Sequence, residues 1–163
     1  MGGRAVTQPP RGQVPGSATN DAAVAGNIGE LISASIASGG AVVAMSTGTP
    51  VTITSVALTP GDWDVWVAAQ FTGNALTTVT YLMASISQVA NTLDTTTADK
   101  ISTLYTAAGT LFATLTGGTG PTVRAGMTRV SVAALTNLYL VAQAGFAINS
   151  LSGFGVIQAR RAR

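Results

Sequence analysis

One stretch of the chain decides the expected fold class, and it reads Trp63-Asp64-Val65-Trp66-Val67-Ala68-Ala69-Gln70-Phe71. Apolar residues return at every second position, which is the repeat of a β-strand with one buried face. The face that we expect in a core carries Trp63, Val65, Val67, Ala69 and Phe71. The opposite face, counted from the residue before the stretch, carries Asp62, Asp64, Trp66, Ala68 and Gln70.

The sequence on either side of this stretch also favours strands. Short segments rich in β-branched and aromatic residues are separated by turn sequences such as Thr59-Pro60-Gly61, where proline presets φ and glycine accepts a positive φ. We expect further strands at 29–36, 41–45, 51–58, 79–87, 127–133, 137–146 and 153–160. This spacing predicts an all-β protein, a sandwich or a barrel, rather than alternating β and α units.

The segment 94–115 fits two interpretations. Asp94 or Thr97 could cap a helix. Apolar side chains follow at helical spacing, namely Ile101, Leu104, Tyr105 and Ala108. The many threonines of this segment argue against a helix, and a long excursion between two strands explains the sequence equally well.

The composition leaves most familiar enzyme chemistry poorly supplied. The chain has 163 residues, a length typical of one domain, with 47% hydrophobic residues, 9% charged residues and a net charge of +2. It contains no histidine, the usual general base and a common metal ligand, and no cysteine to supply a thiolate or a disulfide. We therefore expect a structural or binding protein that is not an enzyme and holds no cofactor or metal.

The strongest acidic candidate is the pair Asp62 and Asp64, which lie two apart on one strand and project from the same face. A carboxylate pair can perform acid–base chemistry only when its environment separates the two pKa values, and nothing in the sequence supplies that environment. We interpret these residues as polar groups at the start of a strand, or as ion-pair partners of Arg124, Arg129 or the terminal arginines. The acidic spacing of a calcium-binding loop is missing.

Neither nucleic acid nor a membrane is an expected partner. The basic residues form no dense face, and the only cluster, Arg160, Arg161 and Arg163, is interpreted as a solvated strand end or tail. The uncharged run 130–159 is long enough to span a bilayer, but polar residues and glycines interrupt it. The glycine-rich stretch 117–121 lacks the lysine of a phosphate-binding loop.

The first part of the chain, residues 1–27, has almost no large apolar side chain and cannot bury enough surface to fold alone. We expect it to be an extended arm that docks on a partner, ahead of a β-sandwich domain at 28–163. The residues expected to dock and to keep the arm extended are Arg4, Pro9, Pro10, Arg11 and Pro15.

Two aromatic residues are expected to point out of the sandwich. Trp66 lies on the face that should meet water, beside Asp64, and a large ring there is either covered by another subunit or offered to a ligand. Tyr139 alternates with the expected core face of its own strand and raises the same question. We assign Trp66, Asp64 and Tyr139 to a subunit interface; a sugar-binding platform and simple local packing are the alternatives.

Several strings together resemble a small domain that recurs in virion proteins of tailed bacteriophages. The similarity runs from about residue 19 to the C-terminus and is clearest at Leu58-Thr59-Pro60-Gly61-Asp62-Trp63-Asp64-Val65, Leu138-Tyr139-Leu140-Val141-Ala142-Gln143 and Ala159-Arg160-Arg161-Ala162-Arg163. It departs from that pattern at 91–115, where the family has shorter loops. The resemblance implies a jelly-roll sandwich, usually trimeric, that serves as a non-enzymatic part of phage heads or fibres.

These observations lead to one expected function and two alternatives. We expect a homotrimeric jelly-roll protein on the outer surface of a phage head, which decorates or cements the capsid by docking its arm on the major capsid protein or another shell protein. The first alternative is a fibre-tip or receptor-binding module whose outer loops, including 91–120, contact a cell-surface glycan. The second is a carbohydrate-acting enzyme that uses the pair Asp62 and Asp64.

Overall fold

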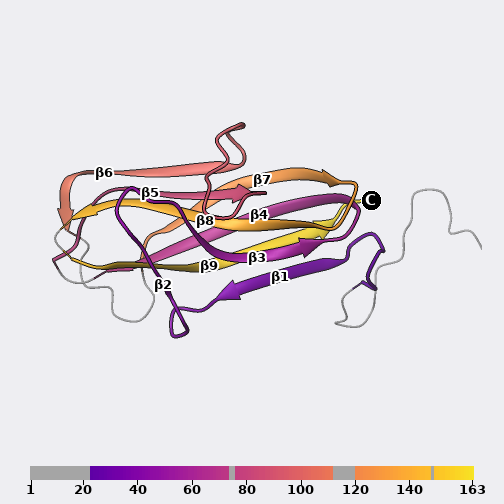
Figure 1. Cartoon of the computed structure of the whole chain (residues 1–163), viewed down its shortest axis with the longest axis horizontal. Coiled ribbons are helices and arrows are strands. Elements are labelled where there is room, and N and C mark those ends of the chain that lie inside the picture. The colour runs from indigo at the N-terminus through magenta and orange to yellow at the C-terminus, as the bar shows by residue number, and fades with distance from the viewer. Residues whose placement is uncertain (1–22, 74–75, 112–119, 148) are drawn as a thin grey trace, which may run out of the picture.

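The structure is a computed structural model, and it describes residues 23–73, 76–111, 120–147 and 149–163, with the backbone alone at 106–111. Within these ranges the protein is all-β and contains no helix, which confirms the expected class. The described strands run roughly along the long axis of the molecule (Figure 1). Their bounds are β1 Leu31–Ile36, β2 Val43–Ala44, β3 Val51–Leu58, β4 Gly61–Gly73, β5 Thr78–Ser87, β6 Ile101–Leu111, β7 Thr122–Val132, β8 Thr136–Ala147 and β9 Leu151–Arg161.

Two antiparallel sheets pack face to face as a sandwich. The first sheet has the order β1-β9-β4-β7. The short strand β2 also pairs with β9, next to β1. The second sheet has the order β3-β8-β5-β6. The pairs β1–β9, β3–β8, β4–β7 and β5–β6 are nested in the sequence, and the pairings β4–β9 and β5–β8 join them into sheets.

The alternation that predicted β4 determines its packing. Trp63, Val65, Val67, Ala69 and Phe71 are buried in the core between the sheets, as predicted, and the residues between them lie on the outer side of the first sheet. The inner face of β8 continues the core from the second sheet through Leu138, Leu140, Ala142 and Ala144. Burying these apolar side chains on both sheets supplies the main driving force for folding.

The turn Thr59-Pro60-Gly61 is a corner between the sheets, because it leads from β3 in the second sheet to β4 in the first. Gly61 has a φ of +145°, and a side chain there would meet the guanidinium of Arg161. Both the backbone conformation and the close approach require glycine at this position. The turn is therefore a tight corner, and β3 and β4 do not form a hairpin within one sheet.

The possible helix within 94–115 is wrong for 94–111, the part of that segment that the structure describes: 94–100 contains no helix and Ile101–Leu111 forms β6 at the edge of the second sheet. Leu104 lies opposite Leu82 of β5 and Tyr105 opposite Tyr81, so pairing with β5 decides the structure. A segment rich in threonine loses less side-chain freedom in a strand than in a helix, which agrees with this outcome.

The residues before β6 fold back over the outer side of the second sheet. Asn91 and Thr52 exchange two hydrogen bonds, backbone N–H to side-chain oxygen, at 2.8 and 2.7 Å. Three residues later the Asp94 backbone N–H donates to Ser85 Oγ at 3.0 Å. Thr52 and Ser85 flank Val141 on neighbouring strands, so the segment 91–94 crosses the sheet at Val141, which is fully buried there.

Candidate interaction surface

Trp66 lies on the outer side of the first sheet and is partly exposed. Its indole N–H donates to Gln158 Oε1 of β9 at 2.8 Å, and the pairing of the two strands places these residues directly opposite each other. The fixed ring borders a hollow of about 300 Å³ in the sheet surface, called here the Trp66 hollow. Its outer lining is Trp66, Ala68, Arg124, Val156 and Gln158.

An ionic cluster adjoins the Trp66 hollow at the start of β4. The Arg129 guanidinium lies 3.4 Å from the Asp62 carboxylate and 3.9 Å from the Asp64 carboxylate, and Arg163 also bonds to Asp62. The Ser131 hydroxyl, which bonds to Asp62, together with these two arginines lowers the pKa of Asp62 to about 2. Asp62 therefore stays ionised at neutral pH.

The expectation that Asp62 and Asp64 pair with arginines is confirmed for Arg129 and, at Asp62, for Arg163. Each carboxylate has a cationic partner, and the cluster lies on an open sheet surface. Among the residues that the structure describes, no group of three or more potential ligand side chains could hold a metal ion.

The cluster of terminal arginines is divided by the fold. Arg160 is exposed on the outer side of the first sheet and Arg163 bonds to Asp62, but Arg161 points inward and is only 5% exposed. The interpretation of all three as a solvated strand end is therefore wrong for Arg161. The alternation of buried Ile157 and Ala159 on β9 continues into Arg161, and this repeat could have identified it from the sequence.

Arg161 is held by what we call the Glu30–Arg161 clasp. Arg161 Nε donates to Glu30 Oε2 at 2.9 Å, the other guanidinium nitrogens donate to Pro60 O and Thr59 Oγ1, and the guanidinium lies 4.3 Å from the centre of the Trp63 ring. Glu30, 8% exposed, also accepts a hydrogen bond from the Gly26 backbone N–H. The clasp closes one end of the sandwich and joins the residues before β1 to the C-terminal end of β9. Figure 1 shows the start of β1 and the C-terminus at the same end of the molecule.

Tyr139 is partly exposed on the outer side of the second sheet, opposite Ser55 of β3 and Ser87 of β5. Trp66 and Asp64 lie on the first sheet, so the fold does not bring the three predicted interface residues to one surface. The five residues assigned to the docking arm, Arg4, Pro9, Pro10, Arg11 and Pro15, lie outside the described residues.

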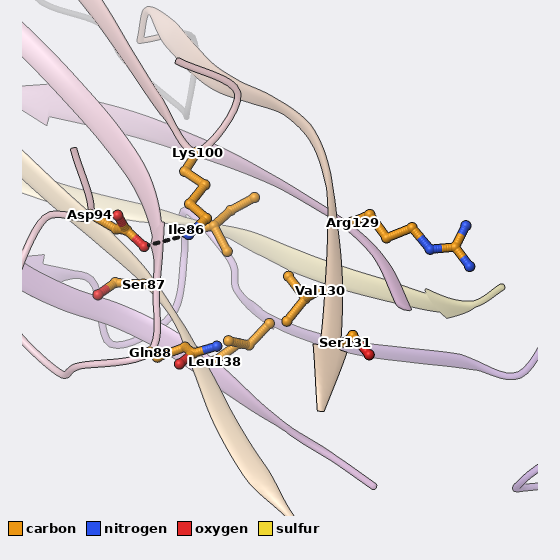
Figure 2. Close-up of a pocket in the computed structure, with 9 residues that line it drawn as sticks. All are labelled: Ile86, Ser87, Gln88, Asp94, Lys100, Arg129, Val130, Ser131 and Leu138. Atoms are coloured by element: carbon orange, nitrogen blue, oxygen red, sulfur yellow. Dashed lines mark hydrogen bonds and ion pairs between the residues drawn. The ribbon is translucent and has the colours of Figure 1, made fainter. Parts of the chain in front are cut away.

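A small cavity of about 150 Å³ opens at the edge of the core (Figure 2). Lys100 Nζ lies 2.9 Å from Asp94 Oδ2 at its mouth, and the guanidinium of Arg129 turns away from that pair in Figure 2. The apolar lining consists of Ile86, Val130 and Leu138. Because Lys100 and Asp94 satisfy each other, this cavity presents no unpaired charge from these two groups to a ligand.

Comparisons with protein-family models, with curated proteins and with solved structures find no match to this chain. A search of the described residues for helices of bilayer-spanning length and apolar character finds none.

Proposed function

We propose that this chain is a structural protein of a tailed-phage particle, a homotrimer that decorates or cements the outer surface of the head. Each protomer is a jelly roll, and residues 1–27 are the arm that docks on the major capsid protein or another shell protein. The protein is not an enzyme, holds no cofactor, and contacts neither nucleic acid nor membrane in this role.

The observation that carries the proposal is the strand order. A jelly roll contains eight strands in two sheets built from Greek keys. The orders β1-β9-β4-β7 and β3-β8-β5-β6, with nested pairs, support this plan, β2 being an extra short segment beside β1. This is the architecture that the resemblance to phage virion domains implies.

The Trp66 hollow supports the trimer. A threefold contact is heterologous, so it joins two different surfaces of neighbouring protomers. Trp66 and Asp64 on the first sheet and Tyr139 on the second sheet suit such a contact because they lie on different faces. Trp66 would fill the centre of the contact, where buried aromatic residues usually contribute most of the binding energy.

The position of the Glu30–Arg161 clasp supports the role of the arm. The clasp fixes the chain at the point where the proposed arm meets the sandwich, through the Arg161–Glu30 bond and the Gly26–Glu30 bond. Three arms anchored in one trimer would bind neighbouring shell subunits together, so that weak single contacts add through multivalency.

The test is the number of copies per particle, measured by quantitative mass spectrometry of purified particles. Hundreds of copies would support decoration of the head, whereas a dozen or two would refute it and favour the fibre-tip alternative. A second test deletes residues 2–27. We expect a folded trimer that no longer binds capsids, and unchanged capsid binding would refute the role of the arm.

A further inference from the structure

The outer side of the second sheet carries a hollow that none of the features above uses. It measures about 340 Å³ and lies between the turn that follows β2, the start of β5 and the end of β8. We call it the Tyr81 hollow. Its lining is Thr47, Gly48, Thr78, Thr80, Tyr81, Gly145, Phe146 and Ala147. These residues include three hydroxyl-bearing threonines and the Tyr81 ring but no charged residue, and the Phe146 side chain packs against the core.

The wall of the Tyr81 hollow is held in place by a network of hydrogen bonds. The turn is joined to β8 by the Gly48 backbone N–H, which donates to Ala144 O at 2.9 Å, and by the Phe146 backbone N–H, which donates to Thr47 Oγ1 at 3.0 Å. Gln143 Nε2 donates both to Gly48 O at 2.8 Å and to Tyr81 Oη at 3.2 Å. The turn and the aromatic ring are therefore fixed by the same side chain.

Gly145 allows the ring to lie against the sheet. A Cβ built at this position would lie 2.4 Å from the Tyr81 ring and 2.5 Å from Thr80 Oγ1, so any side chain would displace both. The ring thus rests on bare backbone as a flat apolar plate at the edge of the hollow. A plate that is ordered in advance binds a ligand with a smaller loss of entropy.

The hydroxyl groups around this plate suit a neutral ligand that both donates and accepts hydrogen bonds. Thr80 Oγ1 donates to Gly145 O at 3.1 Å and keeps its lone pairs for a donor. Thr47 and Tyr81 receive hydrogen bonds from Phe146 and Gln143, which leaves their own hydrogens available to an acceptor. A phosphate, carboxylate or ammonium group would find no opposite charge in the lining.

From this geometry we propose that the Tyr81 hollow binds a neutral sugar. An apolar face of a pyranose ring would lie on the Tyr81 plate, while sugar hydroxyls exchange hydrogen bonds with Thr47, Thr80 and Tyr81. The hollow is on the opposite sheet from Trp66, and Gly145 lies six residues along β8 from Tyr139, about 20 Å in a strand. The proposal therefore stands apart from the role in the phage particle.

The test is saturation-transfer NMR on the full chain in its native oligomeric state, with the methyl glycosides of glucose, galactose and mannose as probes. Because the hollow is open, we expect a Kd of about 1 mM for at least one of them. The Tyr81→Ala and Thr80→Val variants should weaken that binding at least about tenfold, a loss of roughly 1.4 kcal/mol. Thr80→Val keeps a β-branched side chain and removes only the hydroxyl, so it tests the site even if Tyr81→Ala unfolds.

Two controls make the result decisive. Tyr105→Ala removes a ring that lies opposite Tyr81 on β6 but outside the lining, and it should leave the binding unchanged. The methyl glycoside of N-acetylneuraminic acid, which carries a carboxylate, should not compete. The proposal is overturned if no probe binds at about 50 mM, if Thr80→Val binds as the wild type does, or if only the charged sugar binds.

Discussion

Replacing Arg161 with methionine measures what the Glu30–Arg161 clasp contributes to the free energy of unfolding. Arg161 is 5% exposed and Glu30 8%, and their side chains bond at 2.9 Å. Removing one partner of a buried ion pair leaves the other charge uncompensated, which costs about 3–5 kcal/mol. In a domain of this length each kcal/mol lowers Tm by about 2–4 °C, so we expect a fall of roughly 6–20 °C.

The assay is thermal and urea denaturation followed by far-ultraviolet circular dichroism, at one protein concentration throughout. The double variant Arg161→Met with Glu30→Leu removes both charges, and we expect it to be more stable than Arg161→Met alone. The matched control is Arg160→Met, an exposed neighbour whose loss should change stability by no more than about 0.5 kcal/mol. A loss below about 1 kcal/mol for Arg161→Met would refute the reasoning.

The same clasp makes stability depend on pH. The hydrogen bond from the Gly26 backbone N–H, with the hydrogen bond and charge of Arg161, holds the pKa of Glu30 below its ordinary value against the opposing effect of burial. A lowered folded-state pKa adds stability that is fully present above the ordinary pKa and is lost as pH falls through the folded-state value. Glu30→Gln should therefore have a lower free energy of unfolding than the wild type at neutral pH, and this difference should shrink as the pH falls through the folded-state pKa of Glu30.

Three further predictions concern the outer surfaces. If the proposed trimer forms through Trp66, Trp66→Asp should give monomers in sedimentation experiments and Trp66→Phe should give trimers, because an aromatic residue at the centre of an interface contributes about 2 kcal/mol or more. A trimer undisturbed by Trp66→Asp contradicts the assignment. Ser131→Ala should raise the Asp62 pKa from about 2 toward its ordinary value in a carboxyl NMR titration, and no change would exclude Ser131 as a main cause. Asn91→Ala removes the acceptor of the Thr52 N–H, so hydrogen exchange of that amide should accelerate; unchanged protection would mean that Asn91 does not cover this edge.

The fold class could be predicted because it depends on local patterns. The period of two in β4 separates Trp63 from Trp66 onto opposite faces in any sheet, whatever lies across it. The range 51–58 was predicted with the bounds that β3 has in the structure, since a proline-bearing turn lies at each end. β6 was not predicted because its apolar residues fit a helical period as well as a strand, and only pairing with β5 distinguishes them.

The sequence by itself therefore determined which side chains of each strand point inward, through the repeat of two. It also determined how few catalytic side chains are present, because the chain has no histidine and no cysteine. Tertiary structure alone decided which strands lie side by side, and with that which charges meet. Glu30 and Arg161 are separated by 131 positions in the chain and yet form a buried pair. Gly145 and Tyr81 meet in one hollow for the same reason. Contacts across a sheet depend on the register between distant segments, and no local pattern encodes that register.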